Sequence, residues 1–162
     1  MTAWARPAAI VTRRAASLDQ IAGSRGITYL WPKERKKMAR ILVVDDEEYI
    51  RLFYSEELSE EGHKVWTVAT GHELLKRIHL IQPEVVILDI KLVDYDGLEL
   101  LQEIRNHHHN MPVIICTAYD TYKEDPKSMA ADYYVVKSFD LSTLKRAIEK
   151  ALVADTSMRL LV

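Results

Sequence analysis

Ionisable or hydroxyl side chains stand at the ends of four apolar segments of the chain: Asp45, Asp46, Asp89, Thr117 and Lys137. Carboxylates that lie close together repel one another unless a cation lies among them. Oxygen ligands without His or Cys are the set that Mg²⁺ prefers, and an aspartate beside Mg²⁺ can attack a phosphoryl group to form an acyl phosphate. An amine and a hydroxyl can then bind the phosphoryl oxygens. If these side chains meet, their chemistry is Mg²⁺-dependent phosphoryl transfer.

The apolar segments alternate with segments of helical pattern. We predict strands over 40–44, 63–69, 84–89, 112–117 and 132–137, and helices over 47–62, 71–80, 96–105, 121–130 and 140–152. The strands are continuous apolar runs, which is typical of a parallel sheet covered on both faces. In such open sheets the functional groups lie at the carboxyl ends of the strands. The predicted fold class is therefore α/β, with the five side chains gathered at one edge of the sheet.

The charge of the chain is unevenly distributed. Residues 1–37 carry eight Lys or Arg and two Asp or Glu, a net charge of +6, whereas residues 38–162 carry −8. A body of this charge is a poor partner for nucleic acid, and its apolar runs are far shorter than a membrane span. The single cysteine, Cys116, excludes an internal disulfide and fits a reducing cytosol.

Four motifs in chain order resemble the receiver domain of two-component response regulators: ILVVDDEE, VVILDIKLVDYDGLELL, PVIICTAY and DYYVVKSFD. The resemblance covers residues 39–153 and implies a flavodoxin-like (βα)5 doubly wound sheet of strand order 2-1-3-4-5. It implies a cytoplasmic bacterial signalling protein that takes a phosphoryl group from a sensor histidine kinase or a histidine phosphotransferase. Such a protein is not an enzyme in the usual sense, because it catalyses only its own phosphotransfer and slow dephosphorylation.

The resemblance assigns the metal site residue by residue. Asp89 is expected to be the phosphoacceptor, and Asp46 to be a direct ligand of Mg²⁺, with Mn²⁺ as a possible substitute. Asp45 is expected to act largely through water. The backbone carbonyl of Lys91 is expected to be a further ligand.

The resemblance also assigns the residues that respond to phosphorylation. Lys137 would pair with the phosphoryl group, and Thr117 would move to hydrogen-bond it. Tyr134 matches an aromatic position that swings inward as Thr117 shifts. Ala118 matches a small residue that leaves room for the phosphodonor.

Two variable positions bear on the lifetime of the phosphoryl group. Lys91 lies two residues after Asp89, and Tyr119 lies two residues after Thr117. A long lysine and a bulky tyrosine are expected to obstruct the water that hydrolyses the acyl phosphate, so we predict slow self-dephosphorylation. This pair resembles that of stand-alone sporulation phosphorelay receivers.

The first predicted helix also carries apolar residues for a partner. Its buried stripe is expected to contain Ile50, Tyr54 and Leu58, with Tyr49, Leu52 and Phe53 off that stripe and close to the site. We predict that Ile50 and Phe53 take part in docking a histidine-bearing helical bundle. Scattered surface apolar residues without a partner are the alternative.

The sequence departs from the family pattern after the phosphoacceptor and after the lysine. Val93 and Ser138 stand where proline is usual, and the segment between Thr117 and Lys137 is shorter than usual. We therefore expect the helix within that segment to be short or irregular. The family's Lys-Pro peptide bond is typically cis, but a cis bond before a residue other than proline costs about 3–4 kcal/mol, which argues against a cis Lys137–Ser138 bond.

The domain prediction has three parts. Residues 1–37 show no sustained hydrophobic period and are expected to form a flexible basic extension, with a translated leader before Met38 as the alternative. Residues 38–155 are the predicted receiver domain, and 156–162 a short tail. If the chain is complete, we expect a stand-alone receiver, acting either as a relay or as a switch that binds a downstream protein, without direct binding of nucleic acid.

Two other functions remain open at this point. One is a different Mg²⁺-dependent aspartyl phosphotransferase or phosphatase, which would need a general acid two residues after its nucleophile, where Lys91 stands. The other is a receiver-like interaction module that phosphorylation does not regulate. An Asp89-dependent adduct with acetyl phosphate or a beryllofluoride mimic would exclude this module.

Overall fold

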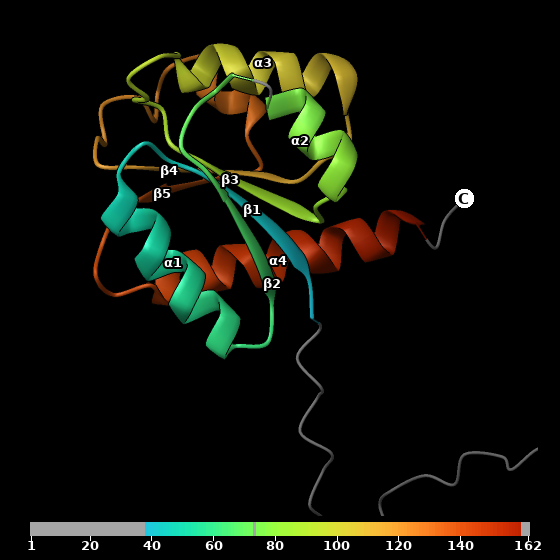
Figure 1. Cartoon of the computed structure of the whole chain (residues 1–162). Coiled ribbons are helices and arrows are strands. Elements are labelled where there is room, and N and C mark those ends of the chain that lie inside the picture. The colour runs from blue at the N-terminus through green and yellow to red at the C-terminus, as the bar shows by residue number, and fades with distance from the viewer. Residues whose placement is uncertain (1–37, 73, 160–162) are drawn as a thin grey trace, which may run out of the picture. The chain divides into compact units, whose positions relative to one another are not determined.

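The computed structural model describes residues 38–72 and 74–159 of the chain, so the predicted extension 1–37 lies outside the described residues. The strands are β1 (Arg40–Val44), β2 (Lys64–Val68), β3 (Val85–Leu88), β4 (Val113–Thr117) and β5 (Tyr133–Val136). They form one parallel sheet in the order β2-β1-β3-β4-β5 (Figure 1). The predicted α/β fold class and strand order are confirmed.

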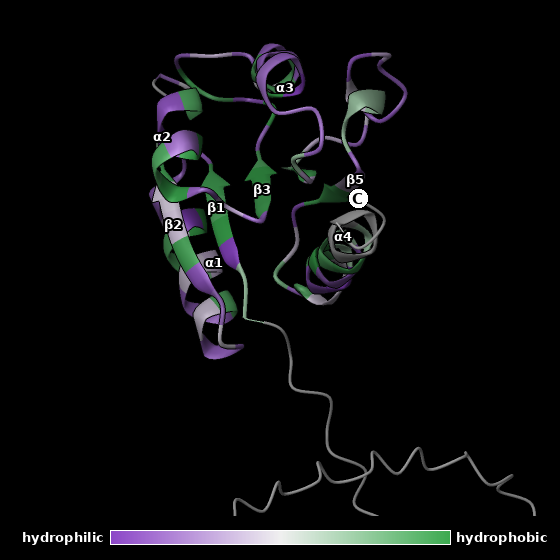
Figure 2. Ribbon diagram, turned by 90° about the vertical axis from the view of Figure 1, so that its right-hand side faces the viewer, coloured by the Kyte–Doolittle hydropathy of each residue, from purple (hydrophilic) through white to green (hydrophobic). Residues whose placement is uncertain are grey.

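Helices cover both faces of the sheet: α1 (Glu48–Glu60), α2 (Leu74–Ile81), α3 (Gly97–His107) and α4 (Ser142–Arg159). Successive strand residues point to opposite faces. In β1, Ile41 and Val43 therefore join the core cluster that includes α1 and α4, whereas Leu42 and Val44 join the cluster that includes α2 and α3. Burial on both faces explains why β1, β3 and β4 are apolar without alternation, as the hydrophobic colouring of β1 and β3 shows (Figure 2). The edge strand β2 is more exposed and more polar.

The α-helix predicted over 121–130 does not form, whereas the expectation of a short or irregular helix in this segment is confirmed. Residues 118–132, which we call the crossover segment, form a series of turns and one short 3-10 helix, η1 (Ser128–Ala130). Pro126 removes a backbone donor, and the Asp125 carboxylate accepts a hydrogen bond from Lys127 N at 2.8 Å, which stabilises a turn. The described residues therefore contain four α-helices instead of the five expected.

The ends of the other helices have local causes. Gly62, just after α1, has a φ of +92°, a conformation that glycine adopts without strain. Asp140 Oδ1 accepts a hydrogen bond from Ser142 N at 2.9 Å where α4 begins. The α4 backbone continues to Arg159, beyond the predicted end at residue 152. Within the described ranges, every helix is too short or too polar to span a lipid bilayer.

Candidate functional site

The parallel strand pairing brings Asp45, Asp89 and Lys137 to one edge of the sheet. Asp89 N donates to Val44 O of the neighbouring strand at 2.9 Å, and Lys137 N donates to Thr117 O at 2.8 Å. These bonds continue the sheet ladder by one residue past its regular strands. Each side chain therefore lies just past the end of its strand, as the order of strands and helices in the sequence predicts.

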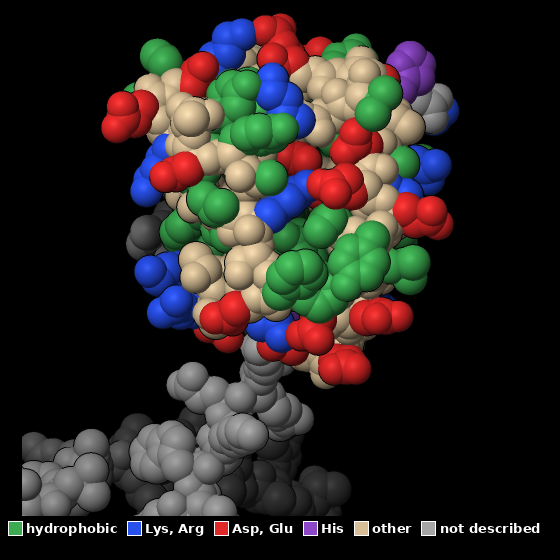
Figure 3. Space-filling view, turned by 90° about the vertical axis from the view of Figure 1, so that its left-hand side faces the viewer, with side chains coloured by type: hydrophobic (Ala, Val, Ile, Leu, Met, Phe, Trp, Pro, Cys, Tyr) green, Lys and Arg blue, Asp and Glu red, His purple; other side chains and the backbone are tan. Residues whose placement is uncertain are grey.

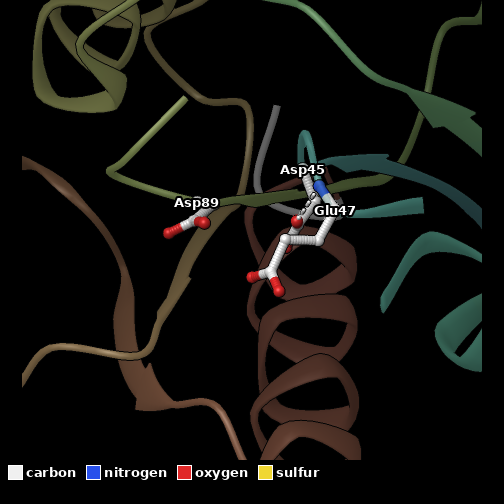
Figure 4. A group of neighbouring side chains, drawn as sticks. All are labelled: Asp45, Glu47 and Asp89. Carbon is white, nitrogen blue, oxygen red and sulfur yellow. Dashed lines mark hydrogen bonds between the residues drawn. The ribbon is translucent and has the colours of Figure 1, made fainter. Parts of the chain in front are cut away.

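Lys137 is the centre of the site. Its Nζ lies 2.8 Å from a carboxylate oxygen of each of Asp45, Asp89 and Glu47. Asp45 and Asp89 are only 2% and 4% exposed. Asp45 and Asp89 follow the ends of β1 and β3, and Glu47 lies at the start of α1 (Figure 4). One ammonium thus balances the two buried carboxylates of Asp45 and Asp89 and the exposed carboxylate of Glu47.

Burial and pairing act in opposite directions on the site's pKa values. Loss of solvation raises the pKa of Asp45, and the nearby Lys137 ammonium offsets this effect only in part. Burial alone lowers the pKa of Lys137, but its hydrogen bonds to Asp45, Asp89 and Glu47 outweigh that effect and raise the pKa well above the ordinary lysine value. Lys137 is therefore a cation throughout the physiological range.

The donor set fits a hard divalent cation. Asp45, Glu47 and Asp89 each offer one carboxylate oxygen, and these oxygens lie within 4.8 Å of one another. Carboxylate oxygens without nitrogen or sulfur ligands suit Mg²⁺. Lys137 shows that this position already attracts positive charge. The site residues observed here are therefore compatible with a Mg²⁺ ion.

The structure does not bring Asp46 into this cluster. Asp46 Oδ2 instead accepts a hydrogen bond from Val93 N at 3.1 Å, and Glu47 takes the third place beside Lys137. Sequence reasoning did not assign a role to Glu47. The acidic run after β1 was the available signal, but only the start of α1 decides which of its members faces the lysine. Arg51 of α1 donates to the backbone carbonyls of Asp45 and Asp46 and so fixes this turn.

Backbone packing holds the acceptor loop, residues 89–96, in place. Gly97 N donates to Ile90 O at 2.8 Å, and Lys91 and Asp96 form an isolated antiparallel bridge. A Cβ added at Gly97 would lie 2.1 Å from Asp89 O. Only glycine permits so close an approach of α3 to the backbone of the expected phosphoacceptor. This close approach explains why the motif VVILDIKLVDYDGLELL has glycine at position 97.

Thr117 ends β4, and Tyr134 lies on the neighbouring strand β5. Thr117 is fully buried, and its Oγ1 has no hydrogen-bond partner within the described part of the chain. Tyr134 is half-buried, and its hydroxyl donates to the backbone carbonyl of Tyr119. The ring of Tyr119 is half exposed and meets the ring of Tyr122 edge to face. Tyr134, one of the two expected switch residues, is thus joined to the crossover segment.

The Lys137–Ser138 peptide bond is trans, as the cost of a cis bond without proline predicts. The following residue, Phe139, is 81% exposed, and its ring lies 6.4 Å from that of Phe53. Tyr49 stacks on the other side of Phe53 at 6.4 Å. Ile50 is half-buried against the core beneath α1. Figure 3, which views the side where α1 begins, shows hydrophobic side chains gathered around a charged centre.

The comparisons with known proteins agree with this geometry. The family model of the response regulator receiver domain matches residues 41–149. The chain belongs to this family. The receiver TrrA of Thermotoga maritima, in complex with Mg²⁺ and a beryllium fluoride, is 46% identical with a TM-score of 0.69, covering 71% of this chain and 100% of that one. The same protein in complex with the histidine kinase ThkA matches with a TM-score of 0.67 over 71% of this chain and 99% of that one.

Curated relatives of this receiver differ in length. Sporulation initiation phosphotransferase F of Bacillus subtilis is 32% identical over 115 residues, which cover 70% of this chain and 93% of that protein. The regulatory protein AtoC of Escherichia coli is 37% identical over 116 residues, but the chain spans only 25% of it. The prediction of a receiver in two-component signalling is confirmed, and an unrelated aspartyl phosphatase is not favoured.

Proposed function

We propose that this receiver accepts a phosphoryl group on Asp89 from a histidine kinase or a histidine phosphotransferase. The observation that carries the proposal is the buried Asp89 carboxylate, with its Oδ2 at 2.8 Å from Lys137 Nζ. Burial restricts the solvation of this oxygen, and the ammonium beside it provides the charge that a phosphoryl group requires. In the transfer, a new P–O bond forms to Asp89 as the P–N bond to the donor imidazole breaks.

The neighbouring side chains would stabilise the product. Lys137 stays cationic and can move its hydrogen bonds from Asp45 or Glu47 to a phosphoryl oxygen. Thr117 Oγ1, buried and without a partner within the described residues, has a free hydrogen to donate to another oxygen. Bound Mg²⁺ would neutralise further phosphoryl charge.

The proposed Mg²⁺ ligands combine the family assignment with the observed cluster. Asp89, Asp46 and the Lys91 carbonyl would bind Mg²⁺ directly, and Asp45 would bind it through water. Glu47 would add a further carboxylate outside the direct ligands. The Glu47 side chain is 60% exposed, so a metal contact there would compete with water. Titration with Mg²⁺, followed by chemical shifts, should show a larger loss of affinity in Asp46→Asn than in Glu47→Gln. The reverse order would assign the inner position to Glu47.

The proposed switch involves Thr117 and Tyr134. If Thr117 shifts toward the phosphoryl group, it vacates space beside β5 that the Tyr134 ring can enter. Tyr134 would then lose its hydrogen bond to Tyr119 O. This movement would couple the chemistry at Asp89 to the crossover segment, and hence to a downstream protein or to the next member of a relay in the cytoplasm.

The proposed kinase-docking surface consists of Tyr49, Leu52, Phe53 and Phe139, with Ile50 supporting it from below. The exposed rings of Tyr49 and Phe139 each lie 6.4 Å from the half-buried ring of Phe53, and such an apolar surface suits the apolar face of a helical bundle. The complex of TrrA with ThkA makes a kinase the natural occupant. Phe139→Ser should slow phosphotransfer from the kinase while leaving phosphorylation by acetyl phosphate unchanged.

The central test uses a small phosphodonor. We expect incubation with Mg²⁺ and acetyl phosphate to add one phosphoryl group by intact mass, and beryllofluoride to form a stable adduct. Asp89→Asn should abolish both, whereas Asp120→Asn, which removes an exposed carboxylate from the crossover segment, should retain both. Absence of any Asp89-dependent adduct would instead identify an interaction module that phosphorylation does not regulate.

A further inference from the structure

A lysine–aromatic contact joins the two chain segments that flank Asp89. Lys91 lies in the acceptor loop, two residues after Asp89, and Tyr122 lies in the crossover segment. Lys91 Nζ is 4.9 Å from the centroid of the Tyr122 ring, within the distance at which a cation is attracted to an aromatic face. Sequence reasoning assigned no role to Tyr122.

Tyr122 is the fixed member of this pair. Its side chain is half-buried and packs against the core cluster of α2 and α3. Its ring meets the Tyr119 ring at a centroid distance of 6.1 Å and an interplanar angle of 85°. Its backbone carbonyl accepts a hydrogen bond from Asp125 N at 3.1 Å. The exposed Lys91 side chain has no comparable packing, so the aromatic face determines where its ammonium lies.

We propose that Tyr122 is a positioning residue that holds the Lys91 side chain across the gap between the acceptor loop and the crossover segment, and thereby prolongs the life of the phosphoryl group on Asp89. The inference rests on the proposed function. In dephosphorylation, a water oxygen attacks phosphorus and the P–O bond to Asp89 breaks, which yields the Asp89 carboxylate and inorganic phosphate. A lysine side chain held across the gap narrows the approach of that water.

The role of Tyr119 changes under this proposal. In the sequence interpretation, Tyr119 obstructs water directly. In the structure, Tyr119 also supports the edge of the Tyr122 ring, and its carbonyl accepts the Tyr134 hydroxyl. Tyr119 would therefore act in part by keeping the Tyr122 face turned toward Lys91.

The contact itself can be tested without phosphorylation. A proton over an aromatic face is shifted upfield, so we expect the Lys91 Hε resonances to lie upfield of those of other lysines in the full chain. Tyr122→Leu should return them to the ordinary position, and Tyr122→Phe should keep them shifted. Tyr95→Leu is the matched control, because it removes a tyrosine from the acceptor loop itself. It should leave the Lys91 resonances unchanged. Unshifted Lys91 resonances in the wild type would overturn the proposal.

The effect on lifetime is tested with protein phosphorylated by acetyl phosphate and then freed of donor. Tyr122→Leu should shorten the lifetime about two- to fivefold, the factor to which an exposed cation–π contact converts. Tyr122→Phe keeps the ring but removes the hydroxyl whose hydrogen bond raises the pKa of Lys91, so it should restore the lifetime only in part. Tyr122→Leu should have no further effect in a Lys91→Met background.

Two results would overturn the inference while leaving the proposed function intact. One is an unchanged lifetime in Tyr122→Leu, and the other is full additivity with Lys91→Met, which would show that the two residues act separately. If neither the wild type nor any variant forms an Asp89 adduct, the proposed function fails and the lifetime role of Tyr122 fails with it. Circular dichroism and thermal unfolding of Tyr122→Leu and Tyr122→Phe exclude a loss of fold as the cause of a shorter lifetime.

Discussion

The acceptor loop and the crossover segment flank the same carboxylate, but different forces hold them. The acceptor loop is held by backbone contacts: Gly97 N donates to Ile90 O, and Gly97 packs against Asp89 O. The crossover segment lacks the expected helix; backbone turns order it internally, and side chains join it to α3. Arg105 of α3 donates three hydrogen bonds, to Ala130 O, Met111 O and Asp132 Oδ2.

Because of this difference, the acceptor loop is expected to be rigid and the crossover segment to be adjustable. Contacts between backbones leave little room for movement, because interiors are close-packed and neither partner can rotate away. Contacts through side chains can be exchanged at low cost by rotamer changes. The phosphoacceptor therefore has a fixed position, whereas the part of the crossover segment around Tyr119, which bonds Tyr134, can respond to what happens there. Four predictions test this contrast.

The largest effect is expected at Gly97. Gly97→Ala places a methyl group against Asp89 O, so we expect a loss of about 3 kcal/mol in the free energy of unfolding, together with slower phosphorylation by acetyl phosphate. Urea unfolding and intact mass measure the two effects. Gly71→Ala is the control: its Cβ meets side-chain atoms of Leu100 and Tyr95, so the loss should be smaller. Equal losses in the two variants would contradict a special role of backbone contact at Gly97.

The next effect concerns the anchor of the crossover segment. Arg105→Met removes three hydrogen bonds, so we expect a loss of about 2 kcal/mol in the free energy of unfolding and faster amide exchange over 118–132. Arg146→Met, which changes an exposed arginine on α4, should cost less than about 0.5 kcal/mol. Formation of the Asp89 adduct should survive in both variants. Loss of the adduct in Arg105→Met would show that the crossover segment also fixes the acceptor.

An effect of opposite sign is expected at Thr117, where the two regions meet. Its buried Oγ1 has no partner within the described residues, so Thr117→Val should raise the free energy of unfolding by about 1 kcal/mol. The same change should weaken binding of beryllofluoride, because the hydroxyl that would bond the adduct is gone. Thr117→Ser, which keeps the hydroxyl, is the control for binding. A beryllofluoride affinity unchanged in Thr117→Val would remove Thr117 from the proposed switch.

The smallest effect is a pH dependence at Asp45. Burial raises the pKa of Asp45 in the folded state above its ordinary value of 3.8, so the folded state binds the proton more tightly than the unfolded state does. The contribution of Asp45 to stability therefore increases as pH falls from neutral toward that value. Asp45→Asn should be more stable than the wild type at pH 7, and this advantage should shrink as the pH is lowered. Urea unfolding across that range measures it, and an advantage that grows at low pH would contradict the raised pKa.

Much of the site was predictable because it follows from strand register. Asp45, Asp89, Thr117 and Lys137 each end an apolar run, and parallel pairing necessarily brings such positions to one edge. The choice between Asp46 and Glu47 was not predictable in this way. Both follow β1 in an acidic run, and the direction of each side chain depends on how α1 begins and on the contact between Asp46 and Val93 N.

The absent helix over 121–130 is the second feature that the sequence did not predict. Residues 121–130 contain Pro126 and several polar residues, and the sequence indicated only that a helix there would be short or irregular. In the structure, Arg105 of α3 donates to Ala130 O, and Lys127 donates to Glu99 of α3. The turns of the segment are therefore anchored to α3 without a helical ladder. Tertiary contacts between segments distant in sequence thus overruled a weak local preference.

The sequence by itself determined the sheet, its order through the family motifs, and the chemical groups at its carboxyl edge, because hydrophobic period and strand ends are local properties of the chain. Only the tertiary structure decided that Glu47 joins Asp45 and Asp89 around Lys137, that the crossover segment lacks its helix, and that Tyr122 lies beneath Lys91. These features depend on side-chain directions at the junctions of elements, and long-range packing sets those directions.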